Sequence, residues 1–104
     1  MKRMMYSEFA EVREAQDLRL IDVREPDEFN EVHVRGAELF PLSRLRNGEV
    51  PEEDARQLVL ICRSGARSAM AANHLEAQGF REIINIEDGT MGAIPHGPDH
   101  VKRG

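Results

Sequence analysis

The chain has 104 residues, a formal net charge of −5 and a single cysteine. This length suits one domain with one modest core and leaves no room here for a second catalytic domain. The acidic balance, without a dense Lys/Arg run, argues against a nucleic-acid partner. One cysteine cannot close an intramolecular disulfide, so we expect a reducing, cytoplasmic location. No segment is long and apolar enough to cross a bilayer, so we expect no membrane partner.

Strands and helices alternate in the predicted order of elements. Apolar and β-branched runs predict strands at residues 3–6, 18–23, 37–40, 58–61 and 82–86. Helix formers and capping residues predict helices at residues 8–15, with Ser7 as N-cap, from Pro26 onward, at 42–45 and at 68–78. Alternation of this kind implies βαβ units, and therefore an α/β fold with a parallel sheet covered by helices on both faces.

The single cysteine follows the most apolar of these strands. Leu58–Ile61 is a run of four apolar residues, too short for a helix and typical of a strand buried on both faces. Cys62 then lies at the carboxyl end of that strand, where open α/β sheets bind their ligands. A loop of residues 63–67 leads into the predicted helix, which ends before Gly79.

A short loop between a strand and a helix favours binding of an anion. The main-chain N–H groups between Arg63 and Ser68 can converge on one point, and the helix behind them presents its positive end. Arg63 and Arg67 add positive charge beside the thiol. We therefore expect Cys62 to be ionised near neutral pH.

Four segments, taken together, resemble a known family. The loop C-R-S-G-A-R-S at residues 62–68 resembles the active-site loop of the single-domain rhodanese (sulfurtransferase) family. Residues 20–29 are similar to the family's D-V-R-E-x-x-E-F segment, residues 33–37 to its H-I-x-G-A segment, and residues 79–89 to its G-F-x-x-V-x-x-L-x-G-G end. The four motifs keep their order, which makes a chance match improbable.

The resemblance implies a rhodanese fold with five parallel strands and a sulfurtransferase reaction. It implies a domain at residues 1–94, followed by a tail at 95–104. The Cys62 thiolate would take the outer sulfur of an anionic donor such as thiosulfate, polysulfide or a persulfide, forming an enzyme persulfide. Cyanide or a thiol, including a protein thiol, would then accept the sulfur. The reaction requires no cofactor and no metal, and we expect neither.

Each residue of the predicted site has an expected role. Cys62 is the catalytic nucleophile. The substrate-binding residues are those of the loop, with main-chain amides around the sulfur and guanidinium groups for the donor's oxygens: Arg63, Ser64, Gly65, Ala66 and Arg67. Arg63 is the better candidate for the donor. Residues expected to support the loop are Asp22 and Arg24, as an ion pair or bracing contact at the mouth of the site, and Ser68.

Two alternative functions stay open. A cysteine, a loop and an arginine also form the phosphate-binding site of cysteine-dependent phosphatases, but the phosphatase loops similar to this one have five residues between Cys and Arg. Cys62 and Arg67 have four residues between them, which favours a ring that fits one added sulfur atom. The chain could also be a non-enzymatic sulfur carrier or binding module, because a fold alone does not guarantee activity.

Other residues have simpler interpretations. His33 is expected to be a hydrogen-bonded structural residue, since an ionised thiolate needs no general base. His96 and His100 are four residues apart, but the Gly and Pro between them argue against a helix and a metal site. The family's Gly-Gly pair is Asp88-Gly89 here, and Ala93 replaces a common Trp, so we expect the last helix to be weak or absent and the tail from Gly92 to be irregular.

Overall fold

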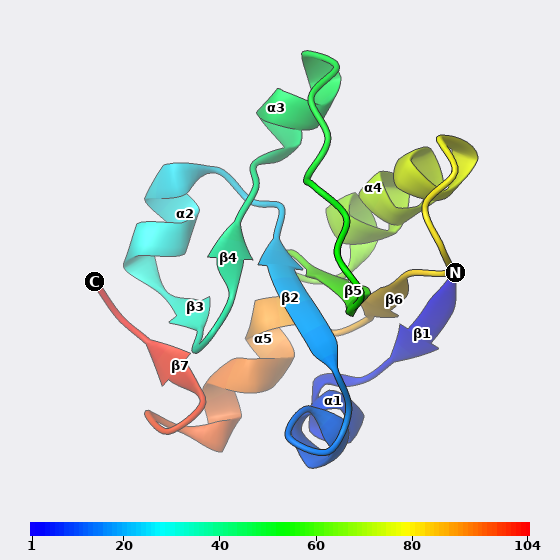
Figure 1. Cartoon of the computed structure of the whole chain (residues 1–104). Coiled ribbons are helices and arrows are strands. Elements are labelled where there is room, and N and C mark those ends of the chain that lie inside the picture. The colour runs from blue at the N-terminus through cyan, green and yellow to red at the C-terminus, as the bar shows by residue number, and fades with distance from the viewer.

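The computed structural model describes all 104 residues and has a five-stranded parallel sheet at its centre (Figure 1). The predicted α/β class with a parallel sheet is confirmed. The strand order is β1-β6-β5-β2-β4, which makes β5 the central strand. The strands span Lys2–Met4 (β1), Leu18–Asp22 (β2), Glu38–Leu39 (β4), Gln57–Ile61 (β5) and Ile84–Ile86 (β6).

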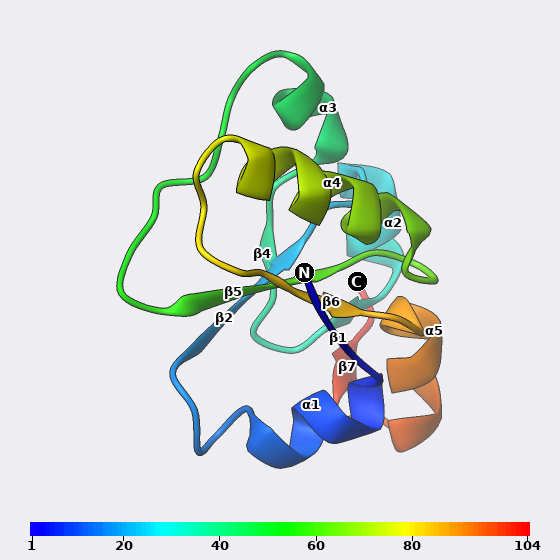
Figure 2. The ribbon, with the colours of Figure 1, turned by 90° about the vertical axis from the view of Figure 1, so that its right-hand side faces the viewer.

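Helices cover both faces of this sheet, as the sequence predicts. Seen along the sheet in Figure 2, α3 (Leu42–Arg46) and α4 (Ala66–Ala77) lie on one side, and α1 (Tyr6–Val12) and α5 (Gly89–Ala93) lie on the other. Beyond the β4 edge are α2 (Pro26–Glu31) and an antiparallel ribbon of β3 (His33–Val34) with β7 (Val101–Lys102). None of the helices has the length and apolar character that crossing a bilayer requires.

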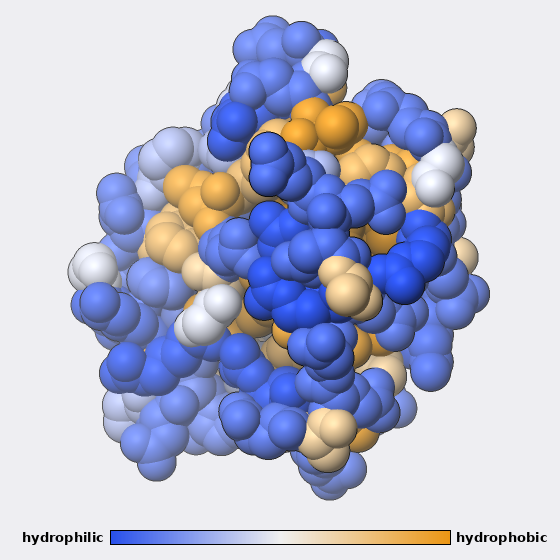
Figure 3. All heavy atoms as spheres, in the orientation of Figure 1, coloured by the Kyte–Doolittle hydropathy of each residue, from blue (hydrophilic) through white to orange (hydrophobic).

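The two faces of β5 contribute to two separate cores. Leu58, Leu60 and Cys62 belong to the cluster under α3 and α4, whereas Val59 and Ile61 belong to the cluster under α1 and α5. This is the period of two that a strand imposes on its side chains. The register therefore directs the cysteine toward the α4 side of the sheet. Outside these cores, hydrophilic residues dominate the face shown in Figure 3, where apolar residues appear only in separate patches.

The first helix differs from the prediction at both ends. Met5, with extended backbone (φ −81°, ψ 156°), is the N-cap in place of Ser7, and its N–H donates to Glu8 Oε1 at 3.1 Å. A glutamate three residues after the cap can satisfy the free N–H, so the helix begins earlier than the hydroxyl of Ser7 suggests. The helix ends at Val12, three residues before the predicted end.

The prediction of an irregular tail is wrong for the last residues. A short α5 is followed by a 3₁₀ turn at Ile94–His96 and by β7, which pairs with β3. Val101 is 6% exposed and packs into the core under α1 and α5. Hydrogen bonds from Arg35 to the main-chain oxygens of Pro98 and His100 hold the same segment. Where a domain boundary falls stays a prediction.

Candidate active site

Cys62 directly follows the central strand, at the carboxyl edge of the sheet. Its main-chain oxygen accepts hydrogen bonds from the N–H (2.9 Å) and the hydroxyl (3.1 Å) of Thr90. The residue is 1% exposed, but its loop neighbours Arg63, Ser64 and Ala66 are exposed. The loop therefore lies at the surface, while its sulfur is nearly covered.

Gly65 closes the loop at the start of α4. It is the N-cap of this helix and has φ +95°, a left-handed conformation that a residue with a side chain rarely adopts. A Cβ atom here would lie 2.3 Å from the main-chain oxygen of Glu87. Both the conformation and the close approach of β6 require glycine, and this turn aims the loop's N–H groups inward.

Three hydrogen-bond donors point at the Cys62 sulfur. Sγ accepts from the N–H of Gly65 at 3.2 Å, from the N–H of Ser68 at 3.4 Å and from the hydroxyl of Ser68 at 3.4 Å. The first two belong to the N-terminal turn of α4, whose twelve residues add the positive end of a helix dipole. The loop therefore forms a ring of donors around one sulfur atom.

These donors act against burial in setting the pKa of the thiol. Burial raises the pKa of Cys62, because it penalises the thiolate. Hydrogen bonds from the Ser68 hydroxyl and from the N–H groups of Ser68, Ser64 and Gly65 lower the pKa, and together they outweigh burial. The net result is a pKa below the ordinary value of a cysteine, the direction that the sequence predicts.

Asn85 on β6 completes the ring from behind and is absent from the sequence-based site. Its side-chain N–H₂ donates to Gly65 O at 3.2 Å and to Glu87 Oε2 at 2.8 Å, while its oxygen accepts from the Ser68 hydroxyl. Asn85 is fully buried between strands of apolar residues. A polar residue inside the run Ile83–Ile86 was the available signal, because a buried amide needs partners.

Gly89 allows α5 to approach the loop from the other side. Its φ is +59°, and a Cβ atom would lie 2.4 Å from Arg63 O and 2.6 Å from Cys62 O. The N–H of Met91 donates to Arg63 O at 3.1 Å. The final glycine of the last motif therefore serves close packing of α5 on the loop, a role that its position in the sequence alone does not reveal.

Asp22 and Arg24 form the ion pair that the sequence predicts, and its role in supporting the loop stays a prediction. Arg24 Nη2 lies 2.8 Å from Asp22 Oδ2, and the Arg24 N–H donates to Asp22 Oδ1 at 2.9 Å. Arg24 Nη2 also donates to Val32 O at 2.6 Å. The Arg24 side chain is 4% exposed and the Asp22 side chain 0%. Losing either one would therefore leave a buried charge uncompensated, at a cost of roughly 3–5 kcal/mol.

Arg67 is engaged by a glutamate that the sequence-based site omits. Its two terminal nitrogens donate to the two carboxylate oxygens of Glu28, both at 2.7 Å. The hydrogen bonds from Arg67 lower the pKa of Glu28 to about 2. This bidentate pair offsets the positive charge that we expected Arg67 to place beside the thiol. A role of Arg67 in donor binding stays a prediction.

Arg63 keeps its guanidinium free of ion pairs and lies at a hollow beside the loop. The hollow has a volume of about 190 Å³ and is lined by residues of α2, α5 and the chain's last segment as well as the loop. Among the predicted site residues, Arg24 and Arg63 reach it. An anionic donor in this hollow would contact Arg63, which directly follows Cys62 in the sequence.

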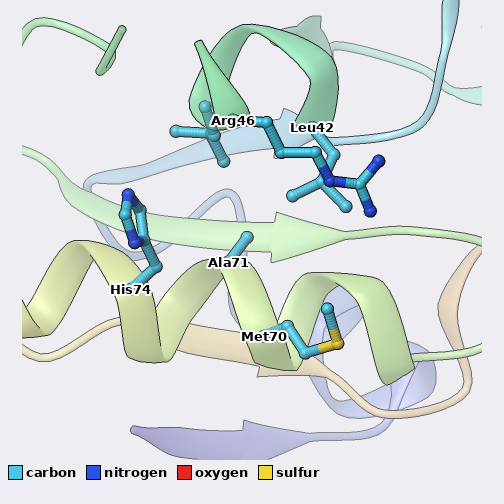
Figure 4. Close-up of a pocket in the computed structure, with 6 residues that line it drawn as sticks. Leu42, Arg46, Met70, Ala71 and His74 are labelled. Atoms are coloured by element: carbon cyan, nitrogen blue, oxygen red, sulfur yellow. The ribbon is translucent and has the colours of Figure 1, made fainter. Parts of the chain in front are cut away.

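A second, more apolar hollow lies between α3 and α4 and is separate from the loop. Leu42, Leu45, Met70 and Ala71 form its walls, and Arg46 and His74 lie at its margin (Figure 4). None of these residues belongs to the ring around Cys62.

The histidines take structural positions. His33 Nδ1 lies 2.9 Å from Phe29 O, and the two rings stack with centroids 3.8 Å apart. His100 Nδ1 lies 2.9 Å from the hydroxyl oxygen of Tyr6. The prediction of a hydrogen-bonded structural His33 is confirmed.

Comparison with known proteins agrees with this geometry. A model of the rhodanese-like domain family matches residues 5–93. A sulfurtransferase of Allochromatium vinosum is 34% identical over 86 residues, which cover 81% of this chain and 78% of that protein. A putative sulfur carrier protein of Bacillus subtilis is 38% identical over 76 residues, or 71% of this chain. The chain belongs to the rhodanese-like domain family.

Some of these relatives are longer proteins, and the fold is shared with solved structures. The matched region is 40% of the Bacillus sulfur carrier and 45% of an uncharacterized protein of Synechocystis. A rhodanese-related protein of Thermoplasma volcanium is 27% identical with a TM-score of 0.84, and the alignment covers 100% of both chains. A rhodanese-like domain protein of Staphylococcus aureus has a TM-score of 0.82 at 23% identity. The predicted family and fold are therefore confirmed.

Proposed function

We propose that this domain is a sulfurtransferase that carries a sulfane sulfur on Cys62. The Cys62 thiolate attacks the outer sulfur of thiosulfate, the S–S bond of the donor breaks, and sulfite leaves with the bonding electron pair. The enzyme persulfide then gives its outer sulfur to cyanide or to a thiol, which restores the thiolate. The observation that carries this proposal is the ring of donors from Gly65 and Ser68 around Sγ.

The ring supports both halves of the reaction. Its N–H groups stabilise the attacking thiolate, and they are available to the anionic outer sulfur of the persulfide. One fixed donor of this kind contributes on the order of 3 kcal/mol to lowering a barrier. Arg63 would hold the oxygens of the donor, since its exposed guanidinium has no carboxylate partner. Asp22 and Arg24 would keep the β2 end rigid beside the loop.

The partners proposed are small anionic sulfur donors and nucleophilic acceptors. Thiosulfate, polysulfides and persulfides share the sulfane sulfur that a thiolate attacks, and cyanide or a protein thiol can remove it. Relatives named as a sulfurtransferase and as a putative sulfur carrier support this range. A cytoplasmic location is part of the proposal, because the single thiol must stay reduced to work.

Thiocyanate formation from thiosulfate and cyanide tests the proposal. We expect Cys62→Ser to abolish it, because a serine hydroxyl is not ionised at neutral pH. Arg63→Ala should raise the KM for thiosulfate several-fold with a smaller effect on kcat. Arg81→Ala is the matched control and should leave both constants unchanged, since Arg81 is an exposed arginine before the amino end of β6, at the edge of the parallel sheet opposite to the loop. Equal KM values in the Arg63 and Arg81 variants would remove the role of Arg63.

The same protein preparation distinguishes the alternative functions. Hydrolysis of an aryl phosphate faster than sulfur transfer would favour a phosphatase, although the loop has four residues between Cys62 and Arg67. A persulfide that forms on Cys62 without turnover to thiocyanate would favour a sulfur carrier that serves a dedicated partner. We include this second outcome because one relative is named as a putative sulfur carrier protein.

A further inference from the structure

The hollow beside the loop shares part of its lining with a second hollow, and Arg103 belongs to both. The first hollow has Arg63 in its wall, and the second, of about 300 Å³, is lined by Arg35, Pro98 and Val101. Ile94 and Arg103 line both. Arg63 lines only the first hollow, so the two arginines occupy different positions on its wall.

The charges in the first hollow leave two guanidinium groups available. Arg24 is paired with Asp22, and Glu28 with Arg67. The groups in this hollow that form no ion pair are Arg63, Arg103 and the carboxylate of Glu31. The unpaired charges therefore sum to one positive charge, with one arginine on the loop and the other in the chain's last segment.

The main chain on both sides of Arg103 is fixed. Val101 is buried, and Lys102 pairs with His33 across the β3–β7 ribbon. The N–H of Gly104 donates to Asn30 O at 2.9 Å. Arg103 is itself exposed between these anchors. These anchors keep the Cα atom of Arg103 beside the hollow, while its exposed side chain keeps its rotational freedom.

Apolar side chains share the wall of the first hollow with the two arginines. Val32, Met91 and Ile94 contribute the apolar part of the first hollow's wall. Thiosulfate, which is small and charged throughout, has no group that would use this surface. An organic donor with an apolar body would cover it and would reach from the loop to Arg103.

We propose that Arg103 binds a second anionic group of an organic sulfur donor, remote from the sulfur that Cys62 attacks. This inference rests on the proposed function and narrows its donor to persulfides or thiosulfonates with an apolar body and a distal carboxylate. For a thiosulfonate, the Cys62 thiolate forms a bond to the outer sulfur, the bond between the two sulfur atoms breaks, and a sulfinate leaves with the electron pair. The persulfide anion remains, so the negative charges of the thiolate and the thiosulfonate pass to the persulfide and the sulfinate, while the distal carboxylate keeps its own.

A matched pair of donors tests this assignment. Benzenethiosulfonate with a para carboxylate and the same molecule with a para carboxamide differ in one distal charge. We expect the wild-type chain to use the carboxylate with a kcat/KM about threefold to fivefold higher, the size of one partly exposed ion pair. Arg103→Ala should remove this preference, Arg103→Lys should keep part of it, and Lys102→Ala, at the exposed neighbour, should keep all of it.

Binding to the Cys62→Ser chain separates this inference from the proposed function, because no sulfur can move there. Calorimetric titration should show tighter binding of the carboxylate donor, and the difference should vanish when Arg103→Ala is added. Equal binding of the two donors, or a preference that survives Arg103→Ala, overturns the role of Arg103. A preserved preference together with no sulfur uptake by wild-type Cys62 overturns the proposed function alone.

Discussion

Removing the hydroxyl of Ser68 should raise the pKa of the Cys62 thiol. In Ser68→Ala the thiolate loses one of its donors, while the N–H groups of Gly65 and residue 68 stay in place. Because these hydrogen bonds favour the charged form, loss of one shifts the equilibrium toward the thiol. At neutral pH a smaller fraction of the protein then carries a reactive thiolate.

The size of this shift follows from how the hydroxyl proton is shared. A hydrogen bond to a charged group contributes roughly 1.5–3 kcal/mol, and one pKa unit corresponds to roughly 1.4 kcal/mol. The Ser68 hydroxyl has one proton for three acceptors, namely Cys62 Sγ at 3.4 Å, Gly65 O at 3.2 Å and Asn85 Oδ1. We therefore expect the lower end of the range, a loss of about 1.5 kcal/mol of thiolate stabilisation, which raises the pKa of Cys62.

The pH dependence of alkylation by iodoacetamide measures this pKa. The curve of Ser68→Ala should move to higher pH and meet the wild-type curve where both thiols are fully ionised. Ser64→Ala is the control, because the exposed Ser64 contributes only its main-chain N–H, which the variant keeps. Thermal unfolding followed by circular dichroism confirms that each variant is folded. An unchanged or lowered pKa in folded Ser68→Ala would refute the reasoning.

Three further substitutions test the structure around the loop. Gly89→Ala should destabilise the chain by more than about 3 kcal/mol in urea unfolding, because φ +59° is strained for alanine and the new Cβ would lie 2.4 Å from a loop carbonyl oxygen. Gly48→Ala is the control and should cost only about 1–2 kcal/mol, because Gly48 has φ +87° but open space around it. Equal losses in the two variants would contradict the close approach of α5. Val101→Ala should cost about 2 kcal/mol, because the side chain is 6% exposed, whereas a change within about 0.5 kcal/mol would mean that the tail does not pack. Glu28→Gln should cost about 1 kcal/mol at neutral pH, a value reduced for partial exposure. Folding lowers the pKa of Glu28 from 4.5 to about 2, so the stabilising effect of its carboxylate is present above pH 4.5 and is lost as the pH falls toward 2. The free energies of unfolding of the wild type and of Glu28→Gln should therefore converge in acid. A difference that stays constant with pH would exclude the ion pair as its cause.

The features that could be predicted from the sequence are local or follow from the order of elements. The run Leu58–Ile61, the glycine at position 65 and the helix formers after it specify a strand, a tight turn and a helix within one stretch of chain. The inward N–H groups of the loop follow from that local geometry. The ion pair of Asp22 and Arg24 could also be predicted, because Asp22 is the last residue of β2 and Arg24 follows it with one residue between them.

The features that could not be predicted depend on contacts between distant segments. Glu28 reaches Arg67 across 39 positions, and Val101 is ordered by pairing with Val34. Asn85 supports the loop only because β6 lies beside β5 in the sheet. No spacing in the sequence encodes these pairs, since they arise from strand order and from the closing of the chain's last segment over α2 and β3.

The central claim is that Cys62 accepts a sulfur atom, and intact-protein mass spectrometry tests it most directly. After incubation with thiosulfate or polysulfide and removal of the donor, we expect the mass of one added sulfur, located on the peptide that contains Cys62 and released by a thiol reductant. Cys62→Ser should gain no mass under the same conditions. A wild-type chain that stays unmodified, although its thiol is alkylated readily at neutral pH, would contradict the account.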